Sequence, residues 1–349
     1  MRSLKFLFVA CLIGLLSACS SKNSNPTVTR TSQPTEIPIQ VQTASPTQTE
    51  LPKTFGPLKI DANPKKGFYW PYFLYIPSVI KSNHFLVVPN NSGKNDNFSI
   101  IEQMALTREV NDHEKWAITL GMPLLVPVFP RPDNETDGTI ASQYLGRGTL
   151  ESIWCKKYTD LCRQDLQLIA MIDDARVRLK DMGINIADDV FIWGYSATGM
   201  FSSRFVILHP DRVKAAAFGG NGWTTVPIDK WEGVTFPFPY GIGDLENLTD
   251  QPFDLGAFCK VSIFSYMGEL DNNGWAMPWY IGNKYNRVGI YKSIISKFGN
   301  TSTALINSAK TIFDNVGCID TFKIYPGMSH QYFPESESDV LNFFIQHSD

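Results

Sequence analysis

The chain has 349 residues, a formal net charge of −3 and 13% aromatic residues. This length is sufficient for one large α/β domain with a sizeable core. The nearly balanced charge excludes the strongly basic composition of nucleic-acid-binding proteins, so we expect no nucleic acid as a partner.

Residues 1–19 have the composition of an export signal. Arg2 and Lys5 precede an apolar segment, 6–16, that is too short to span a bilayer as a mature helix. The signal closes with Leu-Ser-Ala-Cys, which resembles the lipobox of bacterial lipoproteins. The resemblance implies that Cys19 is acylated and becomes the mature N-terminus, and the alternative is an ordinary secretory signal. Both interpretations predict export, and the first predicts lipid anchoring to a bacterial membrane.

Residues 20–57 are rich in Ser, Thr, Pro, Gln and Asn. They contain too few apolar residues to bury a core, so we interpret them as a flexible tether. The folded domain is predicted over residues 58–349.

Short apolar runs alternate with helical periodicity through this domain. Strands are predicted over 68–76, 84–88, 124–129, 190–193, 213–218, 261–267 and 321–325. Helices are predicted over 99–120, 166–182, 197–208, 281–298, 303–316 and 338–346. This alternation predicts an α/β fold, in which a mostly parallel sheet is covered by helices on both faces. Functional groups then gather at the carboxyl ends of the strands.

The run 190–200 reads Val-Phe-Ile-Trp-Gly-Tyr-Ser-Ala-Thr-Gly-Met. A buried strand passes into a helix within one or two residues, which places Ser196 on a sharp corner. Such a corner is typical of the nucleophile elbow, G-x-S-x-G. Thr198 stands where the second glycine is expected, and Gly199 follows it. The alternative is that Ser196 only caps the helix.

A serine hydroxyl becomes a nucleophile when a neighbouring base takes its proton. Of the five histidines, His330 is the one on a loop that follows the last predicted strand. The base needs an acid, and both Glu269 and Asp271 follow the strand 261–267. We choose Asp271 because turn residues follow it and its short side chain can be held rigidly. The alternative for Asp271 is an Asx-turn.

The order Ser196, Asp271, His330 resembles that of the α/β-hydrolase superfamily, and the chain is similar to the exported bacterial esterases in it. The resemblance implies a sheet of about eight strands with the triad at its carboxyl edge. It also implies an oxyanion hole formed by the backbone N–H of Ala197 and a donor from the loop 89–93. Within that loop we select the main chain of Asn91.

These residues predict a serine hydrolase that cleaves carboxylic esters of small molecules or polymers by an acyl-enzyme mechanism. Such a mechanism needs no metal and no organic cofactor. Two alternatives stay open. The first is a serine peptidase on the same fold, and the second is a surface-anchored lipoprotein that binds its ligand without catalysis.

The loop-rich stretch 223–258 lies where this fold commonly inserts a lid. We interpret its aromatic side chains, together with two later tryptophans, as candidates for lining a substrate pocket, and the alternative is ordinary packing of loop side chains. These candidates are Trp223, Trp231, Phe236, Phe238, Tyr240, Trp275 and Trp279.

Export permits disulfides, and four cysteines lie outside the signal segment. Four cysteines allow three pairings. The close spacing of Cys155 and Cys162 favours a local bridge, which leaves Cys259 to pair with Cys318.

Overall fold

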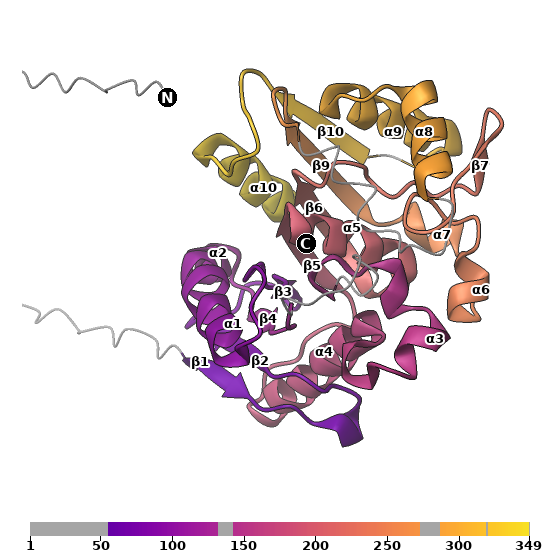
Figure 1. Ribbon diagram of the computed structural model, residues 1–349. Coiled ribbons are helices and arrows are strands. Elements are labelled where there is room, and N and C mark those ends of the chain that lie inside the picture. The colour runs from indigo at the N-terminus through magenta and orange to yellow at the C-terminus, as the bar shows by residue number, and fades with distance from the viewer. Residues whose placement is uncertain (1–54, 132–141, 273–286, 319, 349) are drawn as a thin grey trace, which may run out of the picture. The chain divides into compact units, whose positions relative to one another are not determined.

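The computed structural model describes residues 55–131, 142–272, 287–318 and 320–348 (Figure 1). The signal segment, Cys19 and the tether up to residue 54 lie outside the described residues. Trp275 and Trp279 also lie outside them. Within the described ranges, none of the helices combines the length and the hydropathy of a membrane-crossing segment.

Eight strands form one sheet in the order β1-β2-β4-β3-β5-β6-β9-β10 (Figure 1). Strand β2 runs antiparallel to both β1 and β4, and every other neighbouring pair is parallel. The bounds are β1 (Phe55–Ile60), β2 (Tyr72–Ile76), β3 (Phe85–Val87), β4 (Leu124–Pro127), β5 (Val190–Tyr195), β6 (Val213–Gly219), β9 (Ser262–Gly268) and β10 (Asp320–Tyr325). A separate two-stranded hairpin contains β7 (Lys230–Trp231) and β8 (Val234–Thr235).

Helices cover both faces of the sheet and bury two separate clusters of apolar side chains. One face carries α1 (Phe98–Met104), α2 (Asn111–Leu120) and α10 (Pro334–Gln346). The other face carries α4 (Gln164–Asp181), α5 (Ala197–Leu208), α8 (Arg287–Phe298) and α9 (Ser302–Val316). Three short helices are α3 (Ser152–Cys155), α6 (Leu245–Thr249) and α7 (Leu255–Phe258).

The central strand β5 shows why both faces need cover. Its side chains alternate between the two clusters, with Val190 and Ile192 in one and Phe191 and Trp193 in the other. A strand that is apolar on both faces requires helices on both sides, as in parallel sheets generally. The strand order and the strand–turn–helix corner after β5 are those of the α/β-hydrolase fold, as the sequence predicted.

Several boundaries differ from the predicted ones. The strand predicted over 68–76 begins at Tyr72, and the helix predicted over 338–346 begins at Pro334. Strand β1 begins at Phe55, inside the range assigned to the tether. The predicted helix 99–120 is divided into α1 and α2 by a π-helical turn over Ala105–Val110.

The aromatic side chains of the stretch 223–258 belong mainly to the core. Trp223, Phe236, Phe238 and Tyr240 are all buried in the cluster beneath α5 and α9. Trp223 Nε1 also donates a hydrogen bond to Tyr240 O at 2.8 Å. The interpretation of these four side chains as the lining of a substrate pocket is therefore wrong, because their surfaces are already covered by neighbouring protein atoms.

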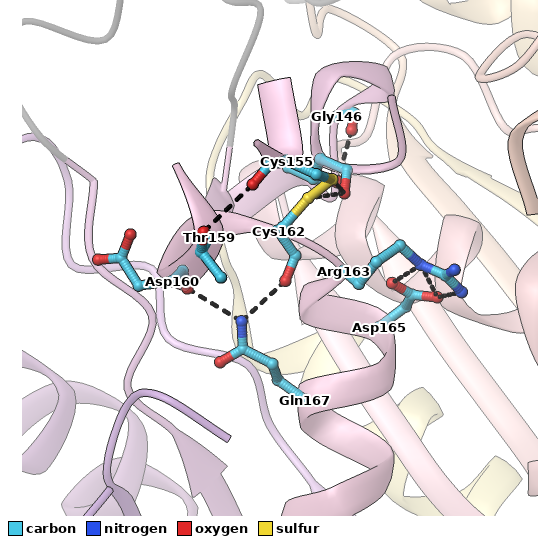
Figure 2. Close-up of a disulfide and its surroundings, with 9 residues drawn as sticks. Gly146, Cys155, Thr159, Asp160, Cys162, Arg163, Asp165 and Gln167 are labelled. Carbon is cyan, nitrogen blue, oxygen red and sulfur yellow. Dashed lines mark hydrogen bonds and ion pairs between the residues drawn. A yellow bond between two sulfur atoms is a disulfide. The ribbon is translucent and has the colours of Figure 1, made fainter. Parts of the chain in front are cut away.

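Both expected disulfides are present, Cys155–Cys162 and Cys259–Cys318. Figure 2 shows the first of them above the start of α4, where the side-chain amide of Gln167 donates to Asp160 O and to Cys162 O, at 2.9 and 2.8 Å. The short bridged loop is thus hydrogen-bonded to the helix that follows it.

Candidate active site

Ser196 occupies the corner between β5 and α5. Its φ of 59° and ψ of −116° lie in a region that residues other than glycine rarely adopt. The corner is fixed by a hydrogen bond from the Ser196 N–H to Gly219 O on the neighbouring strand β6, at 2.8 Å. Such strain persists where the surrounding structure holds it, and it is common at functional sites.

Two glycines make room for this corner. A Cβ atom on Gly194 would lie 2.1 Å from Thr198 O, and one on Gly199 would lie 2.6 Å from Gly219 O. Real Cβ atoms do not approach backbone atoms so closely, so any other residue at these two positions would push α5 away from the sheet. The glycine that allows close packing of α5 on β6 is therefore one residue later than the usual motif predicts.

Thr198, in the place of the second motif glycine, fastens the corner. Its hydroxyl accepts a hydrogen bond from the Tyr195 N–H and donates one to Tyr195 O, both at 3.0 Å. The threonine that replaces the second motif glycine thus adds two side-chain hydrogen bonds across the turn. Nothing in the sequence pattern alone predicts these two hydrogen bonds.

His330 and Asp271 complete a hydrogen-bonded chain with Ser196. His330 Nε2 lies 2.9 Å from Ser196 Oγ, and His330 Nδ1 lies 2.8 Å from Asp271 Oδ2. The Asp271 side chain is fully buried, whereas 27% of the His330 side chain is exposed. A buried carboxylate on one ring nitrogen and a hydroxyl on the other is the arrangement that activates a serine.

Neighbouring strands bring the acid and the base together. Strands β9 and β10 are parallel and in register, with Gly268 opposite Tyr325. Their carboxyl ends therefore lie side by side, and the loops that leave them carry Asp271 and His330. The Leu270 N–H donates to Met328 O at 2.7 Å, which ties the two loops to each other.

Glu269, the other candidate acid, has a different partner. Its Oε2 accepts a hydrogen bond from the Gly327 N–H at 2.9 Å. Glu269 thus braces the loop that carries His330, while Asp271 contacts the imidazole. Ser302 Oγ donates to Asp271 O and holds the acid from the α9 side.

Of the two predicted oxyanion donors, the structure supports one position. Ala197 is the first residue of α5, and the first N–H groups of a helix have no acceptor within it. The Asn91 N–H, in contrast, already donates to Glu109 Oε1 at 2.7 Å. The prediction that the main chain of Asn91 is the second donor is therefore wrong in this structure, because that N–H has an acceptor elsewhere.

A cavity of about 470 Å³ lies beside the corner, on the side of α2 and α10. Tyr195, Thr198 and Asn91 contribute to its lining, but Ser196 does not. Burial raises the pKa of Tyr195, and the nearby charge of Asp271 raises it further, so the phenol stays neutral.

No family model matches the sequence, and no curated protein matches it. Among solved structures, poly(aspartic acid) hydrolase-1 from Sphingomonas sp. KT-1 is 16% identical, with a TM-score of 0.48 over 81% of this chain and 95% of that one. A poly(3-hydroxybutyrate) depolymerase from Bordetella parapertussis is 15% identical, with a TM-score of 0.44 over 79% and 81%. An S-formylglutathione hydrolase from Agrobacterium tumefaciens is 12% identical, with a TM-score of 0.41 over 85% and 95%. Identities and TM-scores this low carry no information about the chemistry of the site in this chain.

Proposed function

We propose that the protein is a serine hydrolase that cleaves carboxylic esters through an acyl-enzyme intermediate. The observation that supports this most strongly is the unbroken chain from Ser196 Oγ through His330 to the buried carboxylate of Asp271, at 2.9 and 2.8 Å. The substrate class is an ester of a small molecule or of a polymer.

In the first half of the reaction, Ser196 Oγ attacks the ester carbonyl while His330 Nε2 takes the hydroxyl proton. Asp271 holds the ring through Nδ1 and stabilises the imidazolium that forms. The negative charge on the former carbonyl oxygen faces the amino end of α5 and accepts a hydrogen bond from the Ala197 N–H. The intermediate collapses when His330 passes its proton to the departing alcohol.

In the second half, water takes the place of the alcohol. His330 removes a proton from the water, whose oxygen attacks the acyl-enzyme carbonyl, and the carbon–oxygen bond to Ser196 then breaks. The proton returns to Ser196 Oγ, and the carboxylic acid leaves. Every proton transfer in both halves therefore passes through His330 Nε2, while Asp271 stays ionised and holds the ring.

A fluorophosphonate label tests this assignment, because such labels react with activated serines. The full chain should be labelled at Ser196, and Ser196→Ala should not be labelled. Ser202→Ala is a matched control on the same helix, since the Ser202 hydroxyl is buried and has no hydrogen-bond partner among the described residues. The control should be labelled like the wild type.

An ester panel separates the three candidate functions. An aryl acetate and a longer acyl ester should be hydrolysed much faster than a peptide amide. Comparable rates on the amide would identify a peptidase. No label on Ser196 and no turnover would support the non-catalytic binding lipoprotein.

We also propose that the protein is exported and anchored through an acylated Cys19. The support is the Leu-Ser-Ala-Cys sequence at the end of the signal segment and the two disulfides, which persist in oxidising compartments. Metabolic labelling with a radioactive fatty acid in a bacterial host should mark the wild type and spare Cys19→Ser. Equal labelling of both would contradict the anchor.

A further inference from the structure

The loop that follows β3 is held at two consecutive residues. The Asn90 side chain donates to Phe129 O at 2.9 Å and accepts from the Phe129 N–H at 2.8 Å, which fixes it to the end of β4. The Asn91 N–H donates to Glu109 Oε1 at 2.7 Å, and its side-chain amide reaches Tyr195 O at 3.4 Å. The peptide at Asn91 therefore connects Glu109 to the nucleophile corner.

Glu109 is an unusual side chain to find at this place. It is 5% exposed, it lies in the π-helical turn between α1 and α2, and its Oε2 is buried without a hydrogen-bond partner in the described part of the chain. Burial raises the pKa of Glu109 to about 7, although the hydrogen bond from Asn91 lowers it. A π-turn inside a helix is frequently found at functional sites. A buried carboxyl with one unpartnered oxygen costs stability. The hydrogen bond that Glu109 accepts from the Asn91 N–H is therefore the contact that points to a function.

We propose that Glu109 is a positioning residue for catalysis, which accepts the hydrogen bond from the Asn91 N–H and so holds the loop 89–93 against the corner of Ser196, where the Asn91 side-chain amide reaches Tyr195 O. This inference rests on the proposed hydrolase function. Oxyanion donors lower the barrier because they are oriented before the charge develops. The Asn91 N–H is itself bonded to Glu109, so Glu109 acts on the corner next to the Ala197 N–H, through the contact between the Asn91 side chain and Tyr195 O. A loop free to rotate at Asn91 would lose this contact while leaving Ser196, His330 and Asp271 in place.

Glu109→Leu and Glu109→Gln distinguish this role from bulk packing. Leucine fills the space without an acceptor, so we expect kcat to fall by about 10- to 100-fold, somewhat less than the loss of an oxyanion donor itself, with KM within about threefold. Glutamine keeps an acceptor oxygen for the Asn91 N–H, so kcat should stay within about threefold of wild type. Fluorophosphonate labelling of Ser196 should slow in the same ratio as kcat.

Glu102→Leu is the matched control. Glu102 lies on α1, directly before the π-helical turn that carries Glu109. Its carboxylate pairs at 2.7 Å with Lys59 at the surface. Its replacement should leave both kcat and the labelling rate unchanged. Wild-type kcat in Glu109→Leu, or an equal loss in Glu109→Gln and Glu109→Leu, would overturn the proposal.

Chemical rescue decides the matter if Glu109→Leu fails to fold. Glu109 lines the 470 Å³ cavity, so acetate can enter the space left by Glu109→Ala and accept the Asn91 N–H. We expect added acetate to raise the kcat of Glu109→Ala several-fold and to leave the wild type unchanged. Absence of rescue in a folded Glu109→Ala would overturn the proposal. A wild type that is neither labelled nor active would instead remove the hydrolase function itself.

Discussion

Among the described residues, two of the histidine–aspartate pairs have nearly the same local geometry and a fully buried carboxylate. His330 Nδ1 lies 2.8 Å from Asp271 Oδ2, and His209 Nε2 lies 2.9 Å from Asp165 Oδ2. Both aspartate side chains are completely buried. The distance and the burial of the carboxylate therefore do not distinguish a candidate catalytic pair from a structural one.

The remaining partners do distinguish them. The second carboxylate is also held by Arg163, whose Nη2 lies 2.7 Å from Asp165 Oδ2 and whose Nε donates to Asp165 Oδ1 at 3.0 Å (Figure 2). Because the Asp165 carboxylate is already paired with the Arg163 guanidinium, it would stabilise a positive charge on His209 only weakly. The ring of His330, in contrast, has the hydroxyl of Ser196 on its other nitrogen.

The two pairs also differ in their positions in the fold. His209 directly follows the last residue of α5, and Asp165 lies in the first turn of α4, so their contact joins two helices. Asp271 and His330 leave the carboxyl ends of β9 and β10, the edge where functional groups gather in parallel sheets. A carboxylate–imidazole contact becomes catalytic when the fold also supplies a nucleophile and an open edge.

Removing the hydroxyl should have the largest effect. Ser196→Ala leaves the contact between His330 and Asp271 intact but deletes the nucleophile, so kcat for an aryl ester should fall by about 10⁴- to 10⁶-fold. Steady-state kinetics measure the change in kcat, and thermal unfolding checks that the variant is folded. Activity within tenfold of wild type would remove Ser196 from the mechanism.

Exchanging the acid in each pair tests the comparison directly. Asp271→Asn should lower kcat by about 10³- to 10⁴-fold, because the amide cannot fix the ring tautomer or stabilise its charge. Asp165→Asn should change kcat by less than about threefold, since its pair contacts no reacting atom in the proposed mechanism. Comparable losses in both variants would mean that the two pairs are not functionally distinct.

The same Asp165→Asn substitution should act on stability instead. Removing one partner from a buried ion-pair cluster typically costs about 3–5 kcal/mol, here because the Arg163 guanidinium and His209 lose their shared acceptor. Burial alone would raise the pKa of Asp165, but His209 and Arg163 outweigh it and lower the pKa. The stabilisation is therefore present above the unfolded pKa near 4 and is lost as pH falls below it. Urea unfolding at pH 7 and pH 3 should show a smaller deficit in the variant at pH 3.

A third pair, His84 with Asp189, should give the smallest effect. Their atoms lie 3.0 Å apart, and 32% of the Asp189 side chain is exposed. Burial works to lower the pKa of His84, but the hydrogen bonds that its Nδ1–H donates to the Asp189 carboxylate and to Asp189 O outweigh it and raise the pKa. Its stabilisation is thus complete below about pH 6.5 and is lost as pH rises through the raised value. His84→Gln should cost about 1 kcal/mol at pH 5.5 and less at pH 9, as measured by urea unfolding. An equal cost at both pH values would contradict the assignment.

Much of the fold and the three candidate catalytic residues followed from local patterns. Runs such as 190–193 are apolar on both faces, which predicts buried parallel strands, and the helix 166–182 has clear periodicity. Ser196 and His330 stood out because each directly follows a strand. Apolar runs, helical periodicity and the place of a residue after a strand depend on neighbouring residues in the chain, so a single sequence is enough to predict them.

Features that depend on contacts between distant residues were not predicted. The sequence favours Asp271 over Glu269 as the acid, but it does not predict the partner of Glu269, which depends on how the loop after β10 turns and places the Gly327 N–H against Glu269. The Asn91 N–H was assigned to the oxyanion hole because nothing near it in the sequence points to Glu109, 18 residues away. Strand β1 was missed because Phe55 continues a stretch of tether-like composition.

The bridge between Cys259 and Cys318 adds a covalent consequence to the pairing of the last two parallel strands. Each cysteine precedes one of these strands, β9 or β10, so the bridge joins the entry points of the segments that carry the proposed acid, Asp271, and the proposed base, His330. A protease cut anywhere between the two cysteines would leave the carboxyl-terminal fragment, with its imidazole, tethered to the body of the protein. On a gel, such a nicked chain would migrate as one species until a reductant separates it into two.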